Sequence, residues 1–300
     1  MNEGKPVPSG AAMWLEGARP RTLPAAVVPV LVGAACAASV ATPVWWRTLP
    51  AAVVSLALQV GVNYANDYSD GVKGTDAARV GPLRLVGSGL VEPVRVKRAA
   101  FAAFAVAGAA GLLLAAVTTL WLLVVGASAI LAAWFYTGGP RPYGYAGLGE
   151  VFVFLYFGLV ATVGTGYVTA GSVTPTMLLA GGAAGCFSCA LLVVNNLRDI
   201  PGDTTAGKRT LAVRMGDPAT RSFFVFLFAA AAVFVVVSSV TAGTTALAGL
   251  LGVLAAVPAV RSVRAGASGR GLVPVLGAVG RAQLVFGVTY AVGLFIALAR

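Results

Sequence analysis

Two short polar segments, each following a long apolar stretch, hold five of the ten acidic residues of this 300-residue chain. They are NYANDYSDGVKGTD at 63–76 and NNLRDIPGD at 195–203. Asparagine precedes aspartate at four-residue steps in both, which places each set on one face if the helices continue that far. The sets are Asn63 with Asp67, Asn66 with Asp70, and Asn195 with Asp199 and Asp203. Mg²⁺ prefers oxygen ligands and commonly bridges a few carboxylates to substrate phosphates. The pattern predicts a polyanionic ligand held through metal.

These acids are electrostatically unfavourable without a partner. Two carboxylates about 5 Å apart repel by roughly 3 kcal/mol at an effective dielectric constant near 20, and helix C-termini disfavour anions. Nearby cations that would offset the repulsion are Lys73, Arg79, Arg84, Arg198, Lys208 and Arg209. The alternative is that the acids are solvated charges beside lipid headgroups. The same asparagine–aspartate spacing after two separate apolar stretches favours the metal site.

The composition places these motifs in a membrane protein. Hydrophobic residues make up 58% of the chain and charged residues only 10%, whereas soluble domains have roughly 25% charged residues. The chain has no histidine, which excludes an imidazole base, a Ser-His-Asp triad and a histidine-bound metal. Cys186 and Cys189 form a CxxC pair within an apolar stretch, and without a second ligand pair we interpret them as packing residues rather than a zinc site.

Hydropathy predicts an all-α integral membrane protein with nine transmembrane helices in a single domain spanning 1–300. About 20 apolar residues are needed to cross the bilayer core. The expected helices cover 22–42, 48–66, 99–117, 119–137, 150–170, 175–195, 222–241, 244–262 and 281–299. The aspartate-rich segments 63–98 and 195–221 are expected as loops.

The distribution of positive charge predicts the orientation. With the N-terminus in the cytoplasm, 19 of the 21 Lys and Arg residues fall on the cytoplasmic side, and Arg47 and Arg300 are the exceptions. This is the asymmetry of the positive-inside rule, and all ten acids fall on the same side. The net charge of +11 is therefore explained by topology and loop ligands, without nucleic acid as a partner.

The aspartate motifs resemble those of the UbiA superfamily of intramembrane prenyltransferases. NDYSDGVKGTD followed by GPLRLVGSG, YTGGPRPYGYAGLGE, and NNLRDIPGDTTAGKRTLAVRMG look like the menaquinone-making branch, whose members prenylate 1,4-dihydroxy-2-naphthoate. The resemblance implies nine helices around a central cavity with cytoplasmic loop caps, in the plasma (inner) membrane. It implies Mg²⁺ as cofactor and two substrates, an allylic polyprenyl diphosphate and a naphthoate. Prenyl transfer with loss of CO₂ would give demethylmenaquinone at a site facing the cytoplasm.

The resemblance and the residue chemistry together assign roles. Metal ligands are expected at Asp67, Asp70, Asp199 and Asp203. Where the family's first motif often has a further aspartate, this chain has Gly74, and Asp76 follows two residues later. Supporting polar groups are Asn63, Asn66, Asn195 and Asn196. Phosphate contacts are expected from Lys73, Arg79, Arg84, Lys208 and Arg209. Aromatic faces attract cations, and expected lining residues around an allylic cation are Tyr64, Tyr68, Tyr136, Tyr143 and Phe152. Arg141 and Arg21 are expected to hold the acceptor carboxylate or the diphosphate.

Two alternatives stay open at this point. The same fold could serve another acceptor, such as 4-hydroxybenzoate, homogentisate, a glycerol phosphate or a sugar phosphate. A remote alternative is an ion-coupled transporter, but such proteins carry charges near mid-span and matching broken helices. Here the acids lie at one end of the expected helices.

Overall fold

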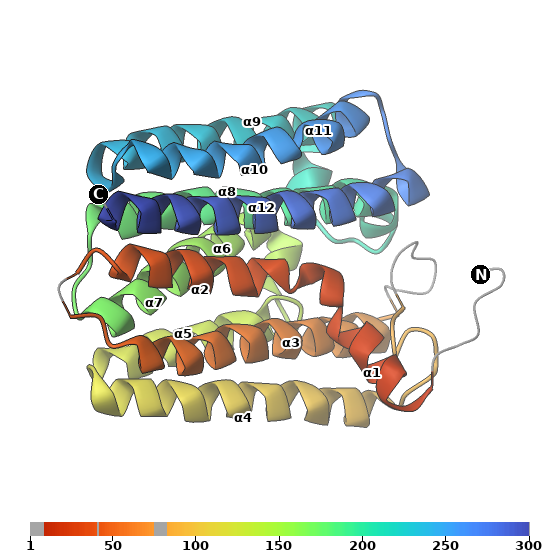
Figure 1. Ribbon diagram of the computed structural model, residues 1–300. Helices are drawn as coiled ribbons and strands as arrows, with labels where there is room; N and C mark the ends of the chain where they lie inside the picture. Colours follow the sequence, from red (N-terminus) through yellow and green to blue (C-terminus); the bar gives the residue numbers. More distant parts are fainter. Residues whose placement is uncertain (1–8, 41, 75–82, 300) are drawn as a thin grey trace.

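The computed structural model describes residues 9–40, 42–74 and 83–299, and in these ranges the chain is helical, with no strand. Its long helices lie side by side in one bundle (Figure 1). The elements are α1 (Gly10–Ala18), η1 (Pro20–Thr22), α2 (Pro24–Ala37), η2 (Trp45–Arg47), α3 (Thr48–Val72), α4 (Pro93–Val117), α5 (Trp121–Phe135), η3 (Tyr143–Ala146), α6 (Gly149–Val153), η4 (Phe154–Val160), α7 (Ala161–Ala170), α8 (Pro175–Thr205), α9 (Leu211–Ala242), η5 (Thr244–Gly249), α10 (Leu250–Ala255), α11 (Val257–Arg264), η6 (Gly269–Gly271) and α12 (Leu272–Leu298). The all-helical fold predicted from the sequence is confirmed.

The helix lengths fit a multi-pass membrane protein. Within the described ranges, seven helical segments are long and apolar enough to cross a bilayer, and the pair α1–α2, bent by 55°, makes an eighth if it is one span. The helix predicted at 119–137 is shorter than expected: it corresponds to α5, which has 15 residues. A bilayer core needs about 20 residues of straight helix.

The two helices that carry the aspartates extend well beyond their predicted ends. α3 continues to Val72 and α8 to Thr205, so the motif acids lie on the last turns of these helices and not in loops. Each helix is followed closely by a left-handed glycine, Gly74 with φ 69° and Gly207 with φ 72°. A glycine adopts this conformation at little cost and so ends a helix. The helices therefore continue through these acids, which is the condition on which the one-sided spacing depends.

α8 forms the centre of the bundle. Its apolar stretch is 83% buried, against 28–44% for the other six spanning segments. The stretch is rich in glycine and alanine, which allow close helix approach in membranes. Gly158 of η4, a π-helical segment, lies so close to α8 that a Cβ there would be 2.5 Å from the Cα of Gly185.

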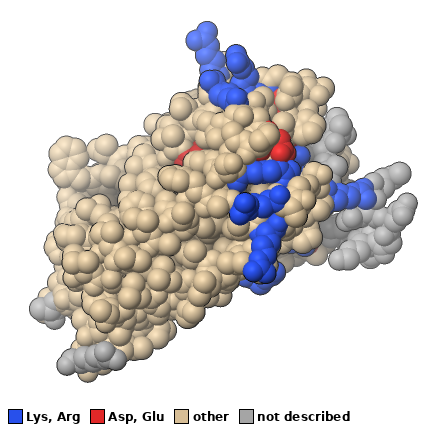
Figure 2. Space-filling model, turned by 90° about the horizontal axis from the view of Figure 1, so that it is seen from above, with Lys and Arg blue, Asp and Glu red and all other residues tan. Residues whose placement is uncertain are grey.

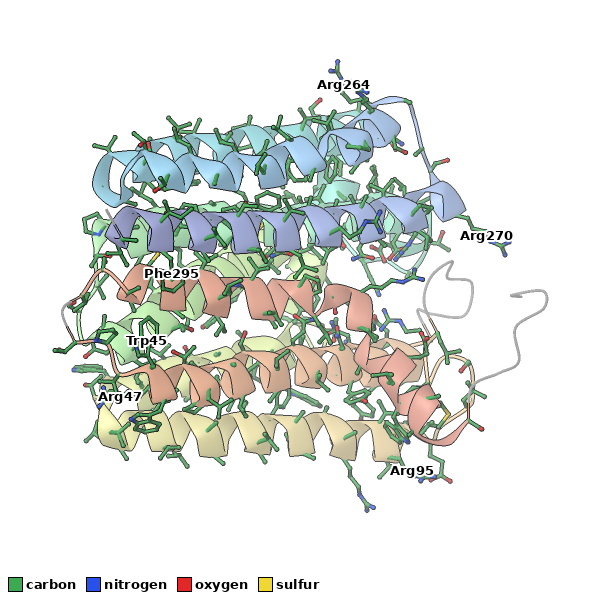
Figure 3. All side chains as sticks on the ribbon, in the orientation of Figure 1. Trp45, Arg47, Arg95, Arg264, Arg270 and Phe295 are labelled. Atoms are coloured by element: carbon green, nitrogen blue, oxygen red, sulfur yellow. The ribbon has the colours of Figure 1, made fainter. Side chains whose placement is uncertain are left out.

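The charges of the described residues gather toward one end of the bundle. Figure 2 shows Lys and Arg grouped toward that end, while most of the visible surface carries no charge. In Figure 3, Arg95 and Arg270 lie toward the right-hand end of the bundle, whereas Trp45 and Arg47 lie at the left-hand end. Large apolar side chains such as Leu112, Val233 and Val240 are exposed on the sides of the bundle, as expected for lipid contact.

Candidate active site

A cavity of about 1110 Å³ lies inside the bundle, lined mainly by α3, α4, α5, α7 and α8 together with segment 136–145. Its ionisable lining residues other than tyrosine are Arg19, Asp70, Arg84, Arg198, Asp199, Asp203 and Lys208. The remaining lining is largely apolar, with Leu58, Val62, Leu122, Ile130, Val160 and Leu192 among its members. The cavity thus combines a charged region for an anion with an apolar region for a hydrophobic group.

α3 presents one polar stripe to this cavity. The stripe consists of Ser55, Gln59, Asn63, Asn66 and Asp70, spaced by three or four residues as the 3.6-residue helical period requires. It leads from the apolar interior to the charged region. Both predicted asparagines of the first motif therefore reach the cavity.

Asp70 is the centre of the charged region. Its Oδ1 accepts hydrogen bonds from the Tyr145 hydroxyl at 2.5 Å and from Lys208 Nζ at 2.9 Å. Its Oδ2 lies 3.6 Å from Nη2 of Arg84. Asp70 is only 4% exposed. Burying its charge is costly, and these three partners offset that cost.

The second motif reaches the same point from α8. Arg198 donates to both carboxylate oxygens of Asp199, from Nε at 2.7 Å and from Nη2 at 2.9 Å. Asp203 Oδ1 lies 3.8 Å from Lys208 Nζ. Lys208 therefore lies between the acids of the two motifs, and the expectation that these motifs meet is supported by the geometry.

The two asparagines of the second motif also line the cavity. Asn195 donates to the Leu191 carbonyl at 3.2 Å. Asn196 donates to Glu150 Oε1 at 2.8 Å, and Glu150 is itself buried. These bonds orient both amides at the wall of the cavity.

Two lysines lie close to the Tyr145 ring. Lys73 Nζ and Lys208 Nζ are 4.8 Å and 4.6 Å from its ring centroid, within the range of cation–π attraction. Lys73 Nζ also donates to the Thr137 carbonyl at 2.8 Å, and the Thr137 hydroxyl donates to Asn66 Oδ1 at 2.7 Å. Burial lowers the pKa of Lys73, an effect that Asp70 opposes and Lys208 reinforces.

An aromatic group lies beside the charged region. Tyr136, Tyr143 and Phe152 all line the cavity. Tyr143 stacks on Phe152 with centroids 4.0 Å apart and meets Tyr136 edge-on at 5.5 Å. The Tyr143 hydroxyl donates to the Ala132 carbonyl at 2.8 Å, and burial raises the pKa of Tyr143, so the phenol stays neutral.

Asp67 differs from the prediction that it faces the cavity with Asp70. It is fully buried and is not part of the cavity lining. Its Oδ2 accepts the N–H of Leu85 at 2.7 Å, and its Oδ1 accepts the N–H of Val86 at 3.0 Å. Three residues along a helix correspond to about 300° of rotation, which turns Asp67 toward the segment that carries Arg84.

The two tyrosines of the first motif also lie outside the cavity lining, contrary to the prediction. The Tyr64 hydroxyl donates to the Trp14 carbonyl at 2.8 Å, and this bond fixes α1 against α3. Tyr68 stacks on Trp134 with centroids 6.1 Å apart. Both side chains are rotated away from the polar stripe by the helical period, and both serve packing between helices.

Comparison of the sequence with known proteins identifies the family. The chain matches the family model described as the UbiA prenyltransferase family over residues 26–271. The chain belongs to the UbiA prenyltransferase family. It is 50% identical over 280 residues to the 1,4-dihydroxy-2-naphthoate octaprenyltransferase of Mycobacterium tuberculosis. The aligned region covers 93% of this chain and 96% of that protein. It is 39% identical over 224 residues to the enzyme of the same name from Escherichia coli, covering 70% of each.

Solved structures show the same UbiA fold. A UbiA homologue from Archaeoglobus fulgidus, solved with GPP and Mg²⁺, superposes with a TM-score of 0.69 over 96% of this chain and 99% of that one. The sequence identity is 14%. The likeness therefore concerns the fold.

Four predicted cations in the described part of this UbiA chain are not in the cavity lining, and one of them, Lys73, is exposed beside the Tyr145 ring. Arg141 and Arg209 are exposed, and Arg21 lies in a separate surface groove beside α12. Arg209 contributes through its backbone N–H, which donates to the Tyr145 carbonyl at 2.9 Å. Arg79 and Asp76 lie outside the described residues.

Sequence reasoning missed two residues of the UbiA cavity. Tyr145 was missed although it stands two residues after Tyr143, because only the fold brings its hydroxyl to Asp70. Arg19 was counted as a topological charge, yet it lines the cavity. The signal for Arg19 was its place directly before the first apolar span, which it shares with Arg21.

The donor set of the cavity fits Mg²⁺ in chemical type. Asn66, Asp70, Asn195, Asp199 and Asp203 supply oxygen atoms along one cavity. Within the ranges that the structure describes, no three Asp, Glu, Cys or His side chains form a ready group for a metal ion. Mg²⁺ is usually held by only one or two carboxylates plus substrate phosphates and waters, so the donors present fit a metal that enters with a diphosphate.

Proposed function

We propose that this protein transfers a polyprenyl group from an allylic polyprenyl diphosphate to 1,4-dihydroxy-2-naphthoate, with loss of CO₂ and diphosphate, to give demethylmenaquinol, the reduced form of demethylmenaquinone. One observation carries the proposal: a cavity that joins the two aspartate motifs at a charged region to an apolar interior lined by several helices. Relatives at 50% and 39% identity that carry the name 1,4-dihydroxy-2-naphthoate octaprenyltransferase support the choice of acceptor.

The charged region is suited to the diphosphate. Lys208 and Arg84 contact Asp70, and Lys73 Nζ lies 4.8 Å from the centroid of the Tyr145 ring. Asp70, Asp199 and Asp203 are the residues that would hold Mg²⁺, as a UbiA homologue was solved with GPP and Mg²⁺. When bound, Mg²⁺ supplies charge neutralisation for the leaving diphosphate. Lys208 and Arg84, which are both buried, add fixed positive charge, and preorganised charge has its largest effect where water is excluded.

Asp67 acts in this proposal through the chain and not through the metal. Its two hydrogen bonds hold the backbone of Leu85 and Val86, directly after Arg84. Asp67 thereby positions the guanidinium that contacts Asp70. We propose it as a positioning residue of the first motif.

The aromatic group is suited to the developing allylic cation. Breaking the allylic C–O bond leaves its electron pair on the diphosphate and positive charge on the prenyl carbon. Tyr136, Tyr143 and Phe152 line the cavity next to the second motif. Aromatic faces attract a cation by roughly 0.5–2 kcal/mol each, and the neutral Tyr143 phenol is a poor nucleophile, so these walls stabilise the cation without capturing it.

The acceptor ring completes the reaction. The ring carbon that bears the carboxylate supplies the electron pair for the new C–C bond to the prenyl carbon. The bond from that carbon to the carboxylate then breaks, CO₂ leaves, and the released electron pair restores the aromatic ring. The apolar part of the cavity receives the prenyl tail, since Leu58, Val62 and Ile130 offer it hydrocarbon contacts.

The charged end is the proposed cytoplasmic end. Lys and Arg gather there, which follows the positive-inside rule. We propose that all nine apolar helical segments cross the plasma membrane, with the α1–α2 pair as one bent span and α5 as a short one. The active site then faces the cytoplasm, where soluble naphthoate reaches it.

The direct test is turnover by the purified full-length chain in detergent or nanodiscs. Radiolabelled farnesyl diphosphate is offered with 1,4-dihydroxy-2-naphthoate, 4-hydroxybenzoate or homogentisate, and prenylated product and CO₂ are measured. We expect product and CO₂ with the naphthoate only, loss of turnover in EDTA, and recovery with added Mg²⁺. Asp199→Asn should abolish turnover in a folded protein. Preferred prenylation of another acceptor would refute the assignment.

A further inference from the structure

Arg19 lies at the bend between the first two helices of the chain. It follows α1 directly, with φ 56° and ψ 71°, and is the one residue other than glycine with positive φ in the described ranges. This backbone region is sparsely populated for residues with a side chain. Such a conformation persists only where the surroundings enforce it, and it is typical of functional positions.

The surroundings that enforce this conformation come from the polar stripe of α3. The Arg19 carbonyl accepts hydrogen bonds from the Thr22 N–H and from the Thr22 hydroxyl, both at 2.9 Å. Thr22 Oγ1 in turn accepts from Gln59 at 3.0 Å and from Asn63 at 3.1 Å. Asn63 also donates to the Ala18 carbonyl at 2.8 Å. The α1–α2 bend is therefore fixed to the cavity wall beside Arg19.

The Arg19 side chain is a cavity cation that forms no ion pair with the described residues. It lines the cavity, and its Nη2 is buried without a hydrogen-bond partner in the described part of the chain. The other three cations of the cavity, Arg84, Arg198 and Lys208, each lie 2.7–3.6 Å from a motif carboxylate. Arg19 as a whole is half-buried, but an enclosed N–H group without an acceptor is unfavourable, so an anion that enters the cavity and accepts from Nη2 would be favoured.

The Arg19 backbone is attached to α3 at a different level from the Asp70 carboxylate. Its backbone is tied to Asn63, and Asn63 precedes Asp70 by seven residues on α3. Seven residues of α-helix correspond to about 10 Å. The Arg19 backbone is therefore held to α3 about 10 Å further from the charged end of the helix than Asp70 is.

We propose that Arg19 binds the carboxylate of the aromatic acceptor, an inference that rests on the proposed function. A guanidinium matches a carboxylate through two parallel hydrogen bonds. The two arginines that the sequence suggested for this role, Arg21 and Arg141, are outside the cavity lining. Arg19 thereby makes the site selective for aromatic acids over phenols that lack a carboxylate. Gln59 and Asn63 complete the polar wall beside it.

The test compares full-length wild-type protein with Arg19→Gln and Arg19→Lys in nanodiscs. KM is measured separately for the naphthoate and for the prenyl diphosphate. A hydrogen bond between charged groups predicts a 10- to 100-fold rise of the naphthoate KM in Arg19→Gln, with the donor KM changed by less than about 2-fold. Arg19→Lys keeps the charge and should recover part of the affinity. Arg95→Gln, an exposed change at the same end of the bundle, is the matched control.

Two inhibitors that differ in the carboxylate separate its contribution to binding from that of the ring. 1-Hydroxy-2-naphthoate carries the carboxylate and 1-naphthol lacks it. We expect Arg19→Gln to raise the Ki of the former by the same 10- to 100-fold and to leave the Ki of the latter within 2-fold. A merely structural role would raise both. If Arg19→Gln does not fold, the ratio of the two Ki values in Arg19→Lys decides, because an unchanged ratio overturns the proposal.

The outcomes also separate this inference from the proposed function. Wild-type protein that fails to prenylate the naphthoate refutes the function itself. Wild-type protein that turns over, together with an unchanged naphthoate KM in a folded Arg19→Gln, refutes only the role of Arg19. A large effect of Arg21→Gln on the naphthoate KM, with none from Arg19→Gln, would assign the carboxylate to Arg21 instead.

Discussion

The two aspartates of the first motif should respond differently to the same substitution. Asp70→Asn removes a carboxylate that lines the cavity beside Lys208 and Tyr145, and we expect at least a 100-fold loss of turnover and a higher Mg²⁺ requirement. Asp67→Asn changes a residue that binds the backbone N–H groups of Leu85 and Val86. It should leave the Mg²⁺ requirement unchanged.

The expected cost of Asp67→Asn follows from these two bonds. The asparagine oxygen still accepts one N–H, but its amide nitrogen is a donor and faces the other, which stays unpaired. A hydrogen bond to a charged group contributes about 1.5–3 kcal/mol, and a buried unpaired N–H costs about 1–3 kcal/mol. Allowing for local relaxation, we expect about 2–4 kcal/mol of lost protection around Leu85, which is about a 30- to 700-fold faster local opening.

The assays are a Mg²⁺ titration of turnover and amide hydrogen exchange in wild-type protein, Asp67→Asn and Asp70→Asn. Faster exchange at 85–88 in Asp67→Asn, with an unchanged Mg²⁺ midpoint, supports a positioning role. Turnover by Asp67→Asn should fall only to the extent that the change displaces Arg84 from Asp70. A Mg²⁺ midpoint that rises as much in Asp67→Asn as in Asp70→Asn, without faster exchange, would show that Asp67 is a ligand and refute the reasoning.

Three further outcomes are expected. Tyr145→Phe keeps the ring close to Lys73 and Lys208 but removes the hydroxyl that donates to Asp70, and kcat/KM for the donor should fall about 10- to 100-fold; an unchanged value would exclude this bond from donor binding. Burial lowers the pKa of Lys73, so its positive charge is present below that pKa and is lost as pH rises through it. Lys73→Arg should therefore extend donor binding to higher pH, which a pH profile of kcat/KM measures. Gly158→Ala places a Cβ 2.5 Å from Gly185 Cα, whereas Gly164→Ala meets nothing within 4 Å; thermal unfolding in detergent should show about 1–3 kcal/mol of destabilisation only for the former.

The membrane class, the helical fold and the two acidic motifs were predictable because they depend on local patterns. Hydropathy identified the first residue of α8 but ended the helix at 195, whereas it continues to Thr205. The four-residue spacing nevertheless placed Asp199 and Asp203 together, and both line the cavity. The prediction that α3 ends at 66 was wrong, because hydropathy falls where polar residues begin, while the helix continues to Val72. A helix ends where its backbone leaves the helical region, and here this happens at the glycine that follows.

The residues that enter the cavity were harder to predict, since one position along a helix turns a side chain by about 100°. Asn63 and Tyr64 are neighbours in sequence, yet one lines the cavity and the other binds Trp14. The partner of Asp67 comes from a segment 18 residues further along the chain. No local pattern indicates such a partner, because the fold of 83–88 decides it.

The charge balance of the cavity explains why both aspartate motifs tolerate burial. The lining acids are Asp70, Asp199 and Asp203, and the cations paired with them are Arg84, Arg198 and Lys208. Three negative charges therefore face three positive charges, and this arrangement limits the desolvation cost that either set would have alone. Arg19 is the fourth lining cation and lies outside this balance. Its Nη2 is enclosed without an acceptor in the described residues, so its positive charge favours an anionic substrate group, which can accept from Nη2, over a neutral one.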